Sequence, residues 1–197
     1  MRPDNTKWIV LTVVAVVFGA LLGPALLGSL PGGIAWPIAL VLILAPLGYV
    51  VWVLAGNKVG KAATPAAMAD AQAFVPAPGM ARIYVVRRGF MGGMAGMKVA
   101  IEGVASGQIR MNQFVMAEVP PGSYTIETAM ARNGMKPSNA ETTLTVAAGD
   151  LVTLRAMLQV NATHAVTVHE RLSLADGRFE IGRAKMVQWT EDRTVFA

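Results

Sequence analysis

The hydrophobic positions of this chain follow two patterns, and the first fills its N-terminal quarter. Between Trp8 and Asn57 the sequence contains no Asp, Glu, Lys, Arg or His. Two apolar stretches in this block are each about 20 residues long, the length that a helix needs to cross a hydrocarbon layer of roughly 30 Å. A short turn rich in Pro and Gly separates them at 29–33. The pattern predicts a two-helix transmembrane hairpin over 8–56, with the lipid bilayer as a partner.

Basic residues flank this apolar block on both sides, whereas the turn inside it has none. Lys and Arg near the ends of membrane spans favour the cytoplasmic side. The distribution therefore predicts that residues 1–7, the C-terminus and the whole region after the hairpin lie in the cytoplasm. An inverted hairpin would place that region outside. The flanking cations are Arg2, Lys7, Lys58 and Lys61.

Small residues recur at every fourth position along the first predicted helix, at Ala15, Gly19 and Gly23. Such a stripe lets two helix backbones approach closely. It serves either packing within the hairpin or association with another membrane subunit or a second copy of the chain. Neither span contains an ionisable group, which argues against a proton or ion pathway through the hairpin.

The second pattern begins at about residue 81, where hydrophobic positions recur at every second residue, as in half-buried strands. The clearest stretches are 97–101, 124–130 and 152–160. We expect an antiparallel β-sandwich of about seven strands over 81–197, joined to the hairpin by a linker over 57–80 with a short helix around 66–73. Turn signals separate the strands at Glu102-Gly103, Pro120-Pro121-Gly122, Asn133-Gly134, Ala148-Gly149-Asp150 and Asp176-Gly177.

Composition changes this picture in two respects. The chain has no cysteine, which excludes disulfides, thiolate metal sites and a cysteine nucleophile. Its net charge is +5, but the basic residues of the β-region are scattered among acidic ones without a dense patch. The charge pattern therefore argues against nucleic acid as a partner.

Three segments carry a resemblance to known proteins. They are 81–87 (Ala-Arg-Ile-Tyr-Val-Val-Arg), 99–103, which ends in a Glu-Gly turn, and 114–126, where a Pro-Pro-Gly turn precedes a strand. Over roughly 81–172 the chain resembles an uncharacterised bacterial family of small β-sandwich domains often found in lipoproteins. It is similar, more loosely, to PEGA-type and transthyretin-like modules. The resemblance implies association with the cell envelope and no established reaction, so it carries over no functional residue.

A glycine-rich segment at 89–97 carries methionines at every third position, Met91, Met94 and Met97. Thioethers at this spacing suit Cu(I). The alternative, which we favour, is a loop whose adaptable Met side chains cover a protein or membrane surface.

Other candidate groups have a plainer interpretation. His164 and His169 are the two histidines, and their spacing places them on opposite faces of a strand, which does not suit a shared metal. Glu102, Glu118 and Glu127 fall on polar strand faces, where carboxylates are normally solvated. A further group of cations brackets the first strand and indicates either an anion contact or a solvated strand edge: Arg82, Arg87 and Arg88.

The sequence thus predicts a non-enzymatic bacterial inner-membrane protein whose β-domain is a protein-interaction or scaffold module, as an accessory subunit of a larger membrane complex. A copper-handling protein built on the methionine loop is the alternative, and a membrane-anchored enzyme is third. We expect no catalytic, cofactor-binding or metal-binding residue and no cofactor. The expected partners are the bilayer and other membrane subunits or a second copy through the first helix, and not nucleic acid.

Overall fold

The computed structural model describes residues 60–89, 96–130, 139–160 and 165–192, together with isolated positions between 28 and 48. Contacts divide the chain into two units, Met1–Val51 and Trp52–Ala197. The β-domain lies in the second unit.

The structure contradicts the prediction of a transmembrane hairpin over 8–56. A charge-free composition does not by itself make a spanning helix, which must be one continuous apolar element of about 20 residues. Among the described residues no helix is both long and apolar enough to cross a membrane. The two-span inner-membrane location is contradicted by the same finding. The small-residue stripe at Ala15, Gly19 and Gly23 lies outside the described residues.

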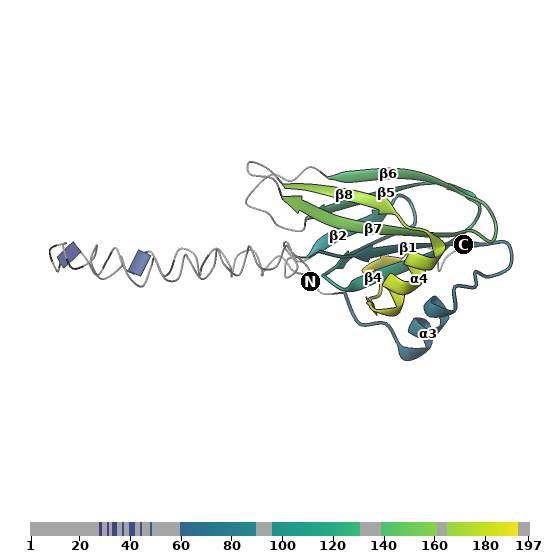
Figure 1. Cartoon of the computed structure of the whole chain (residues 1–197), viewed down its shortest axis with the longest axis horizontal. Helices are drawn as coiled ribbons and strands as arrows, with labels where there is room; N and C mark the ends of the chain where they lie inside the picture. The colour runs from purple at the N-terminus through teal and green to yellow at the C-terminus, as the bar shows by residue number, and fades with distance from the viewer. Residues whose placement is uncertain are drawn as a thin grey trace. The chain divides into compact units, whose positions relative to one another are not determined.

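The β-sandwich expected after the linker is confirmed, and its described strands form two five-stranded sheets (Figure 1). The first sheet has the order β8-β7-β1-β4-β9 and the second has the order β10-β3-β2-β5-β6. Their bounds are β1 Ala81–Arg87, β2 Met97–Ile101, β3 Ala105–Ile109, β4 Gln113–Val119, β5 Gly122–Met130, β6 Ala140–Val146, β7 Leu151–Val160, β8 Ala165–Arg171, β9 Lys185–Met186 and β10 Glu191–Asp192.

The alternation of hydrophobic positions along the sequence correctly predicted which side chains face inward. In β2, Met97, Val99 and Ile101 are buried in the core between the sheets, and β5 and β7 contribute alternate residues in the same way. Two predicted turns are also confirmed. Gly103 and Gly149 have φ values of 74° and 86°, a region that glycine adopts without strain, and they connect β2 to β3 and β6 to β7. The turn predicted at 133–134 lies outside the described residues.

The expectation of a purely antiparallel sandwich is wrong for the first sheet. Strand β1 pairs in parallel with β7, with Ile83 opposite Val152, and β4 pairs in parallel with the short β9. Between β1 and β7 the chain forms β2 and β3 of the second sheet, then β4 of the first, and then β5 and β6 of the second. Side chains alternate with the same period in both kinds of pairing, so the pattern of apolar residues does not distinguish them.

Two short helices cover the outer face of the first sheet, the face turned away from the second sheet. Helix α3, Pro65–Ala73, confirms the short helix expected there and begins at the N-cap Thr64, with Pro at the first helical position, which favours a helix start. Helix α4 spans Leu174–Gly182. Figure 1 shows both helices on the same side of the domain, next to β1 and β4. They enclose a second apolar cluster that includes Phe74, Tyr84, Phe114 and Ile181.

Helix α4 occupies the position where the pair Asp176-Gly177 predicted a turn. Gly177 lies inside the helix and is buried because the helix approaches β7 very closely at this point. A Cβ atom at this position would lie 2.7 Å from Oγ1 of Thr153. Glycine is therefore required here for close packing between helix and strand.

Gly177→Ala should destabilise the domain by about 1–3 kcal/mol, because the added methyl group forces α4 away from β7. Gly182→Ala is the matched control in the same helix, since a Cβ atom there meets nothing within 4 Å. Alanine should leave the stability at Gly182 unchanged or raise it slightly. Urea unfolding of both variants measures the difference, and equal stabilities would contradict the close approach.

Candidate functional site

Helix α3 is attached to the sheet by two residues of β1. The guanidinium of Arg82 donates to the Asp70 backbone carbonyl at 2.8 Å and to both Asp70 carboxylate oxygens at 3.0 and 3.1 Å. Its Nε donates to Glu118 at 3.2 Å. The hydroxyl of Tyr84 donates to the carbonyl of Ala71 at 2.9 Å. Burial is the largest single influence on the pKa of Arg82 and lowers it, but the hydrogen bonds to Asp70, Glu118 and Tyr84 and the charge of Glu118 raise it, and the net pKa is raised.

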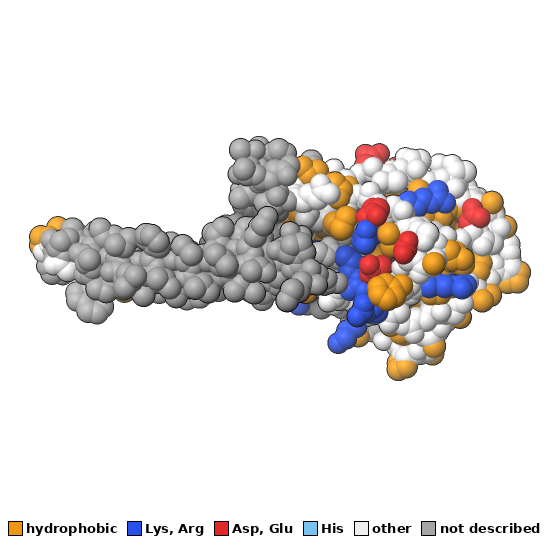
Figure 2. Space-filling model, viewed as in Figure 1, with side chains coloured by type: hydrophobic (Ala, Val, Ile, Leu, Met, Phe, Trp, Pro, Cys, Tyr) orange, Lys and Arg blue, Asp and Glu red, His pale blue; other side chains and the backbone are white. Residues whose placement is uncertain are grey.

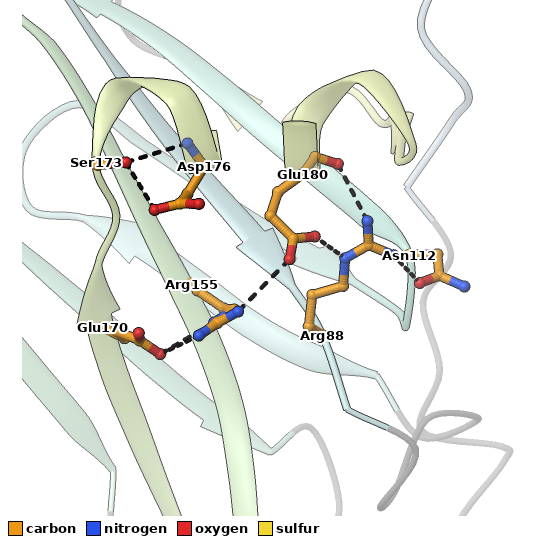
Figure 3. A network of polar contacts seen from close by, with 7 residues as sticks. All are labelled: Arg88, Asn112, Arg155, Glu170, Ser173, Asp176 and Glu180. Carbon is orange, nitrogen blue, oxygen red and sulfur yellow. Dashed lines mark hydrogen bonds and ion pairs between the residues drawn. The ribbon is translucent and has the colours of Figure 1, made fainter. Parts of the chain in front are cut away.

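Helix α4 is attached by a network of ion pairs around Glu180 (Figure 3). The Glu180 carboxylate accepts from Nε of Arg88, and the Glu180 backbone carbonyl accepts from Nη2 of the same side chain at 3.2 Å. Nη1 of Arg155 lies 3.5 Å from the other carboxylate oxygen of Glu180. Arg155 also donates through Nε to Glu170 at 3.1 Å, and Arg88 donates to the side chain of Asn112. These contacts join α4 to β7, β8 and the end of β1.

The first turn of α4 has its own cap. The hydroxyl of Ser173 accepts from the backbone N–H of Asp176 at 3.2 Å and donates to the Asp176 carboxylate at 2.7 Å, as Figure 3 shows. An acidic residue in the first turn also interacts favourably with the helix dipole. Both acidic residues of α4, Asp176 and Glu180, are thus engaged within the domain.

The opposite side of α4 faces solvent and carries an exposed aromatic ring. The side chain of Phe179 is 60% exposed, and the guanidinium carbon of Arg183 lies 4.9 Å from its ring centroid. The guanidinium of Arg178 lies over the ring of Phe74 at 5.6 Å. Leu174 is 48% exposed at the start of the helix.

Two cations of α4 and its C-cap, Arg178 and Arg183, have no carboxylate partner among the described residues. Lys185, the first residue of β9, alternates with Met186, which packs against the apolar cluster under α4, so Lys185 faces the other side of the sheet. Figure 2 shows Lys and Arg side chains on this face of the domain, with acidic and hydrophobic side chains among them. We call the region formed by Leu174, Arg178, Phe179 and Arg183 the α4 surface.

Comparison with known proteins concerns the sandwich that carries this surface. Residues 77–171 match a family model described as a protein of unknown function (DUF2846). No curated protein matches the chain. The family match confirms an uncharacterised domain of unknown function, and it does not extend to the predicted hairpin. The matched residues contain β1 to β8, whereas α3 and α4 lie on either side of the match.

The methionine segment does not form the predicted surface as a whole. Met91 and Met94 lie outside the described residues. Met97 is fully buried between the sheets, paired in register with Ile109 on one side and Met130 on the other. Its side chain therefore belongs to the apolar core.

The arginines that bracket the first strand have structural roles. They were expected at an anion contact or a solvated edge, but β1 is a central strand with both faces buried. Arg82 is paired with carboxylates as described above. Arg87 is 1% exposed inside the sandwich, where its guanidinium donates to the carbonyl of Ile109 at 3.3 Å and burial lowers its pKa to about 10. Arg88 belongs to the Glu180 network.

The predicted carboxylates do not converge. Glu118 pairs with Arg82 and also accepts from the backbone N–H of Ala77. Glu102 lines a shallow hollow of about 180 Å³ beside the β2–β3 turn, with Ser106 and Glu191 nearby. Within the described residues, no group of three or more His, Asp or Glu side chains has the geometry of a metal site.

His169 connects the two sheets. Its Nε2 lies 2.7 Å from Oγ1 of Thr128 on β5, and its Nδ1 lies 2.7 Å from Oγ1 of Thr142 on β6. A neutral imidazole accepts one of these bonds and donates the other. Burial lowers the pKa of His169, which favours this neutral form. His164 lies outside the described residues.

The α4 surface was not found from the sequence, although one signal for its helix is present. Ser173-Leu-Ala-Asp176 places a hydroxyl residue three positions before an acidic residue, which is typical of a helix start. The pair Asp176-Gly177 was interpreted as a turn and concealed this signal. The exposure of Phe179 depends on tertiary packing and has no local signal.

The Arg88–Glu180 pair should contribute more to stability than the Arg155–Glu170 pair. The side chains of the first pair are 21% and 14% exposed, and those of the second are 27% and 46% exposed. A double-mutant cycle with glutamine substitutions should give a coupling energy of about 1–3 kcal/mol for the first pair. The more exposed pair should give less than about 1 kcal/mol. A larger coupling for Arg155–Glu170 would contradict the assigned role of Glu180.

Replacement of His169 by glutamine should reduce the pH dependence of stability. Because burial lowers the pKa of His169, the unfolded chain binds this proton more readily than the folded domain. The stability from neutral His169 is present above its ordinary pKa of 6.5 and is lost as the pH falls through the lower pKa of the folded state. Urea unfolding at about pH 7.5 and about pH 5 measures this loss. An unchanged pH dependence in His169→Gln would show that other groups cause it.

Proposed function

We propose that the β-domain is a protein-binding module that catalyses no reaction, and that it binds its partner through the α4 surface. The observation that carries this proposal is Phe179, whose ring is 60% exposed on a helix that ion pairs hold firmly against the sheet. Aromatic residues and arginine are the types most often found as anchors at the centre of protein interfaces.

The neighbours of Phe179 leave its ring accessible. Residues three and four positions away along a helix lie on the same side. For Phe179 these are Ala175, Asp176, Gly182 and Arg183, all of which are exposed. Ala175 and Gly182 are too small to cover the ring, the Asp176 carboxylate is bonded to Ser173, and Arg183 lies over one part of the ring. A partner side chain can therefore reach the aromatic face directly.

The attachment of α4 supports binding by a preformed surface. Arg88 and Arg155 fix Glu180 from two strands, and Gly177 allows the helix to lie close to Thr153. A helix held in this way loses little conformational freedom when a partner binds, which improves affinity.

Phe179→Ala should weaken partner binding by about 2 kcal/mol or more, the size typical of an interface anchor. The tagged protein is purified from its native cells, and the recovered partner is then titrated against wild-type and variant protein. Met111→Ala is the control, because Met111 is also an exposed apolar side chain but lies in the turn between β3 and β4. Equal affinity of wild type and Phe179→Ala would contradict the proposal.

A further inference from the structure

The cations of the α4 surface differ from the other arginines on the same face of the domain. Arg82, Arg88 and Arg155 each contact at least one carboxylate. Arg178 and Arg183 lie over aromatic rings and contact no carboxylate within the described residues. The surface therefore presents positive charge that the described part of the domain does not neutralise.

The acidic residues close in sequence to these cations are already engaged. Glu180 binds Arg88 and Arg155, Glu170 binds Arg155, and Asp176 caps its own helix. A rotation of one of these carboxylates toward Arg183 would break a contact that holds α4 in place. The guanidinium groups of Arg178 and Arg183 are therefore available to another molecule.

The contact with the Phe179 ring leaves the guanidinium of Arg183 able to bind a carboxylate through its edge. A guanidinium is planar and carries five N–H donors around its edge. When its face lies over a ring, the edge remains available, and two of its N–H groups match the two oxygens of a carboxylate. The ring also restricts the side chain, so less freedom is lost on binding. Phe179 thus serves both as an apolar contact and as a support for Arg183.

We infer that the α4 surface binds an acidic protein segment, in which carboxylates contact Arg178 and Arg183 while an apolar side chain packs on Phe179. This inference rests on the proposed function and specifies its partner. A protein segment fits better than a nucleic acid because the surface offers two guanidinium groups beside exposed apolar side chains and no dense patch of cations. A peptide supplies carboxylates and apolar side chains together, whereas nucleic-acid binding relies mainly on many contacts of Lys and Arg with phosphates.

The test uses the full chain and a fluorescently labelled peptide in which glutamate alternates with leucine. A second peptide carries glutamine in place of every glutamate. The wild-type protein should bind the glutamate peptide at least roughly tenfold more tightly than the glutamine peptide, as expected when charge-assisted hydrogen bonds are lost. Salt should weaken binding of the glutamate peptide, because the contacts are exposed. Equal affinity for both peptides would overturn the inference.

Substitutions on the α4 surface test whether the peptide binds there. The double variant Arg178→Gln, Arg183→Gln should bind the glutamate peptide roughly tenfold more weakly and with less dependence on salt. Two other exposed cations, Lys98 and Arg171, provide control substitutions to glutamine that should leave binding unchanged. Thermal unfolding checks that each variant is folded. If the double variant is destabilised, Arg183→Glu alone replaces it and should bind a lysine–leucine peptide in preference to the glutamate peptide.

Other ligands distinguish the possible sources of negative charge. A single-stranded oligonucleotide and vesicles of anionic phospholipid are titrated under the same conditions. Tighter binding of either one than of the glutamate peptide, with the same dependence on Arg178 and Arg183, would overturn the inference. If Phe179→Ala abolishes binding of the natural partner but the double variant does not, the proposed function stands and the acidic partner is excluded. If neither change affects that partner, both proposals fail.

Discussion

Strand β1 is buried on both of its faces, and this constraint determines much of the domain. Ile83 and Val85 face the core between the sheets, while Tyr84 and Val86 face outward. An outward face made of such residues cannot remain in water, because exposing it would cost the free energy of burying large apolar side chains. The first sheet therefore requires a cover, which α3 and α4 provide.

Burying β1 also places a cation where water cannot solvate it. Arg82 is 3% exposed, and an unpaired charge at that depth would be strongly destabilising. The Asp70 and Glu118 carboxylates satisfy this requirement and at the same time fix α3. In the same way, the ion pair between Arg88 and Glu180 fixes α4. The ion pairs thus determine where the helices lie, and the position of α4 in turn exposes Phe179 and Arg183.

The sequence predicted those parts of the fold that depend on local patterns. The strands at 97–101, 124–130 and 152–160 were recognisable because one face of each is apolar, and the turns at Gly103 and Gly149 because glycine adopts a positive φ there. Long-range features were not predicted. The parallel pairing of β1 with β7 joins residues about 70 positions apart, and neither strand carries a local mark of its neighbour.

The failures have identifiable physical causes. The charge-free stretch 8–56 predicted spanning helices from composition, whereas no helix among the described residues is long and apolar enough to cross a membrane. Gly177 was interpreted as a turn residue, although its role is to let α4 approach Thr153. The motif Arg82-x-Tyr84 was recognisable as part of a family pattern, but only the fold shows that both side chains hold α3.

The central claim is that the α4 surface is where this domain meets its partner, and crosslinking in living cells tests it most directly. A photoreactive phenylalanine analogue is incorporated in place of Phe179 and, in a separate strain, in place of Lys98 on the second sheet. The account predicts a discrete crosslinked product from position 179 and none from position 98. A product from position 98 alone would contradict it and would assign the binding surface to the opposite sheet.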